Sequence, residues 1–146
     1  MTHPRDDEAR RIVDLVGGDH RAAFGIVEGQ LAVLVLRTQV LLSLSGIVIT
    51  VTGFSGRAIA QTGDLARVLI SAGILIVLAA ALTAIGGVLK LRWLTQDIAD
   101  DPLTTVTRAL ALRDAKSRSL GVAMILFGIG FACYCAAIAQ LLMHPR

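Results

Sequence analysis

The sequence predicts an all-α integral membrane protein with three transmembrane helices. Three uncharged runs, at residues 38–56, 68–89 and 119–143, hold 19, 22 and 25 residues. At about 1.5 Å of rise per helical residue, each run can cross a hydrocarbon layer of about 30 Å. The composition agrees, because 55% of the residues are hydrophobic and only 17% are charged. A soluble domain of this size cannot hide so much apolar surface, so we expect lipid to cover it.

The first 36 residues are expected to form cytoplasmic amphipathic helices. Residues 6–16 carry opposite charges four positions apart together with apolar side chains, a pattern typical of a short helix. Gly17 and Gly18 should end this helix. A second helix is expected to begin near Asp19 and can run without interruption into the first span.

Arg37 lies directly before the first uncharged run. We interpret it as an interfacial anchor whose long side chain reaches back toward lipid phosphates. The alternative is a functional charge inside the membrane, paired with Glu28 or with an acid of a partner protein. From Arg37 onward, residues 37–146 are predicted to form the membrane domain.

Two links of different character join the three spans. Residues 55–67 are too few to fold alone, so we expect a plain external turn between antiparallel helices. The inner link at 90–118 opens with Lys90, Arg92 and Trp93, residue types that suit the headgroup layer. These three residues are therefore predicted interface anchors.

The rest of the inner link is expected to be a basic cytoplasmic helix that leads into the third span. Two aspartates directly before Pro102 are typical of a helix start. The basic run at 113–118 would then lie at the inner membrane surface, with Lys116 and Arg118 as further anchors. Specific binding of lipid or nucleotide phosphates by this run is the alternative.

The distribution of basic residues predicts a cytoplasmic N-terminus and an external C-terminus. Cytoplasmic loops hold the excess of Lys and Arg, and three cations fall on one side of the predicted spans against eleven on the other. The three are Arg57, Arg67 and Arg146. The net charge of +3 is small, so no nucleic-acid partner is indicated.

Small residues at helical spacing within the spans are the candidate helix-packing positions. Helices in lipid associate where small side chains let their backbones approach closely. These stripes are Ser43, Gly46, Thr50 and Gly53 in the first span, Ala80, Ala84 and Gly87 in the second, and Gly128, Ala132 and Ala136 in the third. They favour packing within one chain, or association with sister copies or other membrane subunits.

The residues offer little chemistry, so we predict no catalytic, cofactor or metal site and no enzyme. Cys133 and Cys135 point about 200° apart on a helix, so they can neither bridge each other nor share a metal. None of the three predicted core runs contains an acid, Lys or Arg, which argues against a proton relay or ion-coupled transport. No small-molecule substrate is indicated.

The arrangement of helices resembles that of a known group of membrane effectors. An amphipathic helix feeds the first span at 35–42, and a basic helix enters the last span at 115–121. This order is similar to that of the small three-span membrane effectors of Pycsar-type bacterial antiphage systems. The resemblance implies a location in a bacterial inner membrane and a membrane-perturbing or pore-forming role, and it transfers no functional residue.

Two functions therefore stay open at the level of the sequence. The favoured hypothesis is a non-enzymatic membrane scaffold or accessory subunit that associates through its small-residue helix faces. The alternative is a membrane-perturbing or pore-forming effector of a bacterial defence system. Three helices alone shield few faces, so both hypotheses expect an assembly with sister copies or other membrane subunits in the lipid bilayer.

Overall fold

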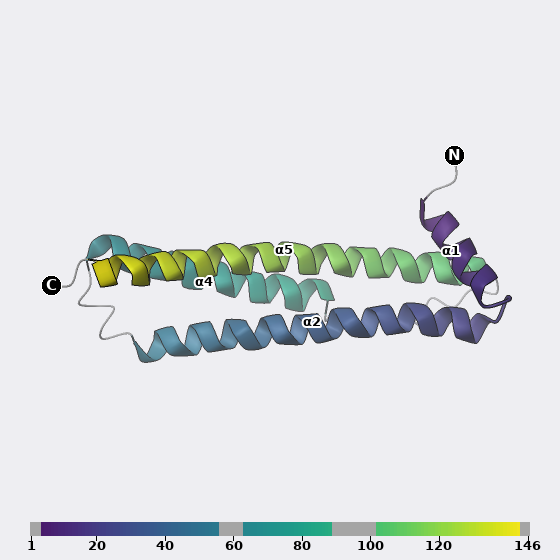
Figure 1. Ribbon diagram of the computed structural model, residues 1–146, viewed down its shortest axis with the longest axis horizontal. Coiled ribbons are helices and arrows are strands. Elements are labelled where there is room, and N and C mark those ends of the chain that lie inside the picture. Colours follow the sequence, from purple (N-terminus) through teal and green to yellow (C-terminus); the bar gives the residue numbers. More distant parts are fainter. Residues whose placement is uncertain (1–3, 56–62, 89–101, 144–146) are drawn as a thin grey trace.

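The computed structural model describes residues 4–55, 63–88 and 102–143, whose regular structure is entirely α-helical (Figure 1). These ranges form four helices, α1 (Pro4–Leu15), α2 (His20–Phe54), α4 (Asp64–Val88) and α5 (Pro102–Met143). The predicted all-helical fold is confirmed. Helices α2, α4 and α5 are each long and apolar enough to cross a membrane.

A tight reversal at Gly17 and Gly18 separates α1 from α2. Both glycines have positive φ, 61° and 81°, a backbone region that residues with a Cβ atom rarely adopt. The N–H of Gly17 donates to the carbonyl of Asp14 at 3.2 Å, which closes the end of α1. Asp19 then caps α2, because its Oδ1 accepts the backbone N–H of Arg21 at 2.8 Å.

Two of the helices are much longer than a single membrane crossing requires. Helix α2 has 35 residues and α5 has 42, against 25 in α4, which corresponds to about 52, 63 and 37 Å. Helices α2 and α5 run in the same direction and α4 runs against them (Figure 1). Both long helices continue past the end of α4 at Val88. We call this two-helix extension, residues 20–37 of α2 with 102–118 of α5, the stalk.

Helices α4 and α5 make the closest contact in the bundle. Gly73 and Gly130 are both buried and face each other across the helix pair. A Cβ atom added to Gly73 would lie 2.9 Å from the carbonyl oxygen of Gly130. Only glycine allows the two backbones to approach this closely. Towards the stalk, the Ser119 hydroxyl donates to the carbonyl of Thr83 at 3.3 Å and joins the same two helices.

Helix α2 turns a stripe of small hydroxyl residues towards the other two helices. Thr38, Ser45 and Thr52 recur every seven residues, and all three are buried. Each hydroxyl donates to the carbonyl four residues earlier, at 2.7 to 2.8 Å. Because the polar hydrogen is satisfied within the helix, these side chains pack as small groups at little polar cost.

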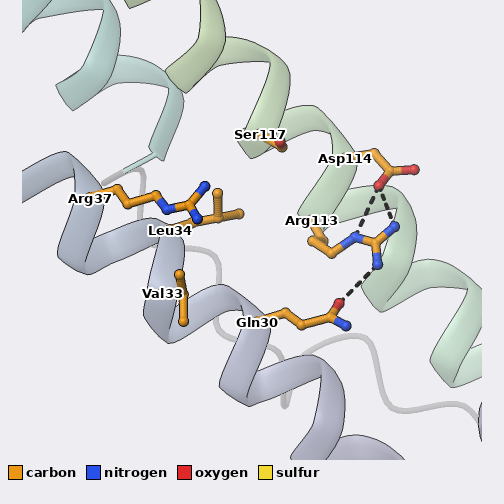
Figure 2. Close-up of a pocket in the computed structure, with 7 residues that line it drawn as sticks. All are labelled: Gln30, Val33, Leu34, Arg37, Arg113, Asp114 and Ser117. Atoms are coloured by element: carbon orange, nitrogen blue, oxygen red, sulfur yellow. Dashed lines mark hydrogen bonds and ion pairs between the residues drawn. The ribbon is translucent and has the colours of Figure 1, made fainter. Parts of the chain in front are cut away.

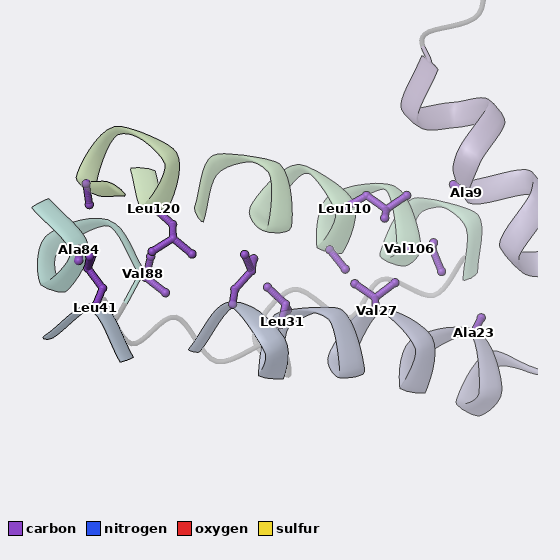
Figure 3. Packing of buried hydrophobic residues seen from close by; sticks show 13 residues of the cluster. Ala9, Ala23, Val27, Leu31, Leu41, Ala84, Val88, Val106, Leu110 and Leu120 are labelled. Carbon is purple, nitrogen blue, oxygen red and sulfur yellow. The ribbon is translucent and has the colours of Figure 1, made fainter. Parts of the chain in front are cut away.

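The core of the stalk is apolar and continues into the three-helix bundle. Figure 3 shows Val27 and Leu31 of α2 facing Val106 and Leu110 of α5. Ala9 of α1 belongs to the same buried cluster. At the other end the cluster reaches the last turns of α4 through Ala84 and Val88. One continuous core therefore connects α1 to the bundle.

Candidate functional site

The predicted packing residues of the second span lie inside the bundle. Ala80 and Ala84 are fully buried. A Cβ atom added to Gly87 would overlap the side chain of Ser119 on α5. This stripe is therefore occupied by packing within the chain.

The predicted stripe of the first span lies on a different face of α2 from the buried hydroxyl residues, because Gly46 and Gly53 directly follow Ser45 and Thr52 and so point about 100° away from them. Its four members, Ser43, Gly46, Thr50 and Gly53, are all exposed in the single chain. A Cβ atom added to either glycine would meet nothing within 4 Å. The prediction that this stripe packs against another helix therefore applies only to a helix of another molecule.

The third-span stripe is also exposed. Gly128, Ala132 and Ala136 face outward on α5, whereas Gly130 and Ala137 are buried. The two glycines are two residues apart, so they point about 200° apart on the helix. The outward face of α5 is therefore a second small-residue surface without an intramolecular partner in the described part of the chain.

The predicted interface anchors divide into two groups. Lys90, Arg92 and Trp93 lie outside the described residues. Arg37 is exposed at the start of the uncharged run of α2. The other two lie one to three residues before the uncharged run of α5: Lys116 is half-buried, and Arg118 is exposed with its Nε 3.4 Å from the carbonyl of Asp114.

A polar cluster around Arg113 ties three helices together within the stalk. The guanidinium of Arg113 on α5 donates to Glu8 of α1 at 2.6 and 3.0 Å. It also donates to Oε1 of Gln30 on α2 at 2.8 Å. Its own neighbour Asp114 accepts from Nε at 3.0 Å and from an NH2 nitrogen at 2.7 Å. The cluster therefore fixes α1 against both helices of the stalk.

Arg113 is fully engaged by these contacts. A guanidinium carries five N–H donors, and the hydrogen bonds above use each of them. The hydrogen bond to Glu8, followed by the contacts with Asp114, raises the pKa of Arg113 above its ordinary value. Arg113 lies before the uncharged run of α5 and stays charged at every pH that the protein tolerates.

A cleft of about 390 Å³ opens between α2 and α5 beside this cluster. Its walls are formed by seven residues: Gln30, Val33, Leu34, Arg37, Arg113, Asp114 and Ser117. Figure 2 shows the Arg37 side chain extending from α2 into the space between α2 and α5, beside Leu34. The volume falls in the range of about 300 to 1,000 Å³ that is typical of small-molecule sites.

Reasoning from the sequence missed both the cluster and the cleft. In the sequence, Arg113 is one cation of the basic run at 113–118, and its partners Glu8 and Gln30 lie 105 and 83 residues away in the chain. The amphipathic patterns of residues 6–16 and of the helix after Pro102 indicate which faces need a partner. They do not show that these two faces meet.

The described residues include no group of three or more His, Cys, Asp or Glu side chains that could hold a metal ion. Comparison of the chain with protein-family models, with curated proteins and with solved structures found no match. The functional argument therefore rests on the chain's own surfaces.

Proposed function

We propose that this protein is a non-enzymatic integral membrane scaffold that assembles with further copies of itself through the small-residue faces of α2 and α5. One observation carries the proposal. Small residues at helical spacing occupy outward faces of two long apolar helices, where nothing in the described part of the chain covers them. Close helix approach in lipid depends on such faces.

Membrane insertion is part of the proposal and is supported by the outer surface of the bundle. Large apolar side chains are exposed on all three long helices, including Val40, Ile47 and Val51 of α2, Leu75 and Leu82 of α4, and Ile125 and Ile129 of α5. Soluble monomers rarely expose contiguous apolar surface on this scale. We propose that lipid covers it and that the stalk lies on the cytoplasmic side, where the basic residues of the sequence are concentrated.

We propose that a second copy of this chain covers the exposed small-residue faces of α2 and α5. Gly128, Ala132 and Ala136 repeat at four-residue steps, the small-xxx-small spacing that lets two membrane helices cross closely. Gly46 and Gly53, seven residues apart on α2, offer a second face of the same kind. Each chain therefore carries two faces through which its helices can pack against those of another copy.

The test replaces a small outward residue with a bulky one and measures the size of the particle. Gly46→Leu and Ala132→Leu each add side-chain volume to one proposed contact face. Gly86→Leu is the matched control, because Gly86 is also exposed with nothing within 4 Å of an added Cβ atom but lies on α4, outside the two faces. Light scattering of the full chain in mild detergent gives the mass of each protein particle.

We expect an oligomer for the unaltered chain and for Gly86→Leu, and a shift towards monomer for Gly46→Leu, Ala132→Leu or both. All three variants should keep their helix content, because each side chain enters open space. A monomeric unaltered chain, in detergent and in lipid nanodiscs alike, would refute self-assembly. Co-purification with a different membrane protein would show that this partner, and not a second copy, covers the small-residue faces. Membrane depolarisation on induced expression would favour the pore-forming alternative.

A further inference from the structure

The cleft between α2 and α5 lies at one particular level of the molecule. Arg37 is the last residue before the uncharged run of α2, and Ser117 comes two residues before that of α5. Both residues line the cleft. Helix α4 ends at Val88, which packs with Leu41 and Leu120 just inside the uncharged runs (Figure 3). The cleft therefore opens where the three-helix bundle becomes the two-helix stalk.

Its two arginines differ in what they can do. The five N–H donors of Arg113 are used by Glu8, Gln30 and Asp114. The Arg37 guanidinium, in contrast, extends into the cleft (Figure 2) and makes no hydrogen bond or ion pair with any described residue. Of the two arginines in this cleft, Arg37 is thus the one whose N–H groups are free to bind an anionic ligand.

Ser117 supplies a second free donor on the opposite wall. Hydroxyls elsewhere in the same helices, such as those of Thr38 and Thr107, donate to the carbonyl four residues earlier. The Ser117 hydroxyl makes no such bond, nor any other within the described ranges. The acid of the cleft, Asp114, accepts from the Arg113 guanidinium at 2.7 Å. Because Arg113 also pairs with Glu8, these three groups together carry a formal charge of −1, and the attraction for an incoming anion must come from Arg37.

We propose that this cleft binds a phosphate oxyanion between the guanidinium of Arg37 and the hydroxyl of Ser117. A guanidinium presents two parallel N–H groups that match two phosphate oxygens, and such charge-assisted bonds are among the strongest in proteins. Val33 and Leu34 form an apolar wall beside the two donors. This wall suits the carbon portion of a phosphate ester.

The phosphate can come from a lipid headgroup or from a soluble phosphate ester. A lipid source agrees with the level of the cleft, because the start of the uncharged runs is where headgroup phosphates lie in the proposed membrane orientation. The Arg113 cluster then has a definite part: it holds α1, α2 and α5 together, and so sets the width of the cleft without touching the ligand. The inference does not depend on self-assembly.

The experiment measures binding of two probes to the full chain in a phosphate-free detergent such as dodecylmaltoside. The first probe is phosphatidylglycerol added to the micelles, with retained lipid counted by native mass spectrometry. The second is inorganic phosphate added to lipid-free micelles, with the shift in thermal unfolding midpoint as readout. The variants are Arg37→Gln, Ser117→Ala and the matched control Arg118→Gln. Arg118 is exposed at the same level of α5 but does not line the cleft.

We expect Arg37→Gln to weaken binding of the retained probe about tenfold, the loss typical of one charge-assisted contact. Ser117→Ala should weaken it about threefold, as expected for a neutral donor. Arg118→Gln should change it less than about twofold, because it removes only diffuse surface charge. Retention of phosphatidylglycerol alone identifies a lipid headgroup as the ligand, and a shift with inorganic phosphate alone identifies a soluble phosphate as the source; either supports the proposal.

The proposal is overturned if Arg37→Gln and Arg118→Gln weaken binding equally, since the attraction would then belong to the basic surface as a whole. It is also overturned if neither probe binds the unaltered chain. Circular dichroism checks that each variant keeps its helix content. Should Arg37→Gln fail to fold, Ser117→Ala and Arg37→Lys decide the matter, because lysine keeps the charge but lacks the planar fork and should bind with intermediate strength.

Discussion

One added methyl group at Gly130 tests whether the glycine contact between α4 and α5 holds the bundle together. In Gly130→Ala, the new Cβ atom would lie 2.8 Å from the carbonyl oxygen of Gly73 and 2.8 Å from Cγ2 of Val77. Ordinary van der Waals contacts begin at 3.4 Å. The two helices must therefore separate locally by about 0.6 Å, or neighbouring side chains must leave their preferred rotamers.

The size of the effect follows from this separation. A gap of about 0.5 to 1 Å forfeits roughly a quarter to a half of the dispersion energy of the atoms involved. Overpacking of a close contact costs about 1–3 kcal/mol. Alanine also has a higher helix propensity than glycine by about 1 kcal/mol, which acts in the opposite direction. Gly121→Ala removes this second effect from the comparison, because Gly121 lies on the same helix, outside the proposed association face, with nothing within 4 Å of an added Cβ atom.

We expect Gly130→Ala to be about 1–3 kcal/mol less stable than Gly121→Ala. The measurement is the free energy of unfolding in mixed micelles, followed by helix ellipticity as the fraction of denaturing detergent is raised. Gly73→Ala should behave like Gly130→Ala, since its Cβ atom would lie 2.9 Å from the carbonyl oxygen of Gly130. The double variant should lose less than the sum of the two, because both methyl groups use the same separation of the helices. Equal unfolding free energies for Gly130→Ala and Gly121→Ala would refute this account of the packing.

Three further substitutions test the stalk and the end of the bundle next to it. Glu8→Gln removes the charge of a side chain that is 40% exposed, so solvent screens its pair with Arg113 and the docking of α1 should lose about 0.5–1 kcal/mol. This loss should appear as a few-fold faster amide exchange confined to α1. Unchanged exchange would contradict the docking role of this pair. Gly18→Ala places a Cβ atom at a φ of 81° and should cost about 1 kcal/mol, with the same loss of protection in α1. Gly87→Ala overlaps Ser119 and should destabilise the bundle by about 1–3 kcal/mol. Adding Ser119→Gly should restore part of that loss, and no recovery would show that the two positions do not share the contact.

Residues 17–19 show how much of the chain's organisation local chemistry can predict. Two consecutive glycines followed by an aspartate predict a helix end, a reversal and a new helix start, and the structure has α1 ending at Leu15 and α2 beginning at His20. Turn and cap preferences depend on the backbone of a few neighbouring residues. They can therefore be inferred without knowing the rest of the fold.

The inward faces of the three long helices could not be inferred in this way. In a soluble helix the apolar stripe marks the buried side, but a span that is apolar all round carries no such signal. Gly128 and Gly130 look equivalent in the sequence, yet only Gly130 meets another backbone. In the uncharged run of α2, Thr38, Leu41, Ser45 and Thr52 are buried, and the candidate stripe lies on a different, exposed face.

The sequence by itself determined that the chain holds three helices long and apolar enough to cross a membrane, because an uncharged run of about 20 residues can satisfy its backbone in lipid only as a helix. The tertiary structure alone decided that α2 and α5 continue together as a stalk, that Glu8 reaches Arg113, and that Arg37 is left facing a cleft. These contacts join residues far apart in the chain. They follow from how whole helices pack, and no local pattern of residues carries that information.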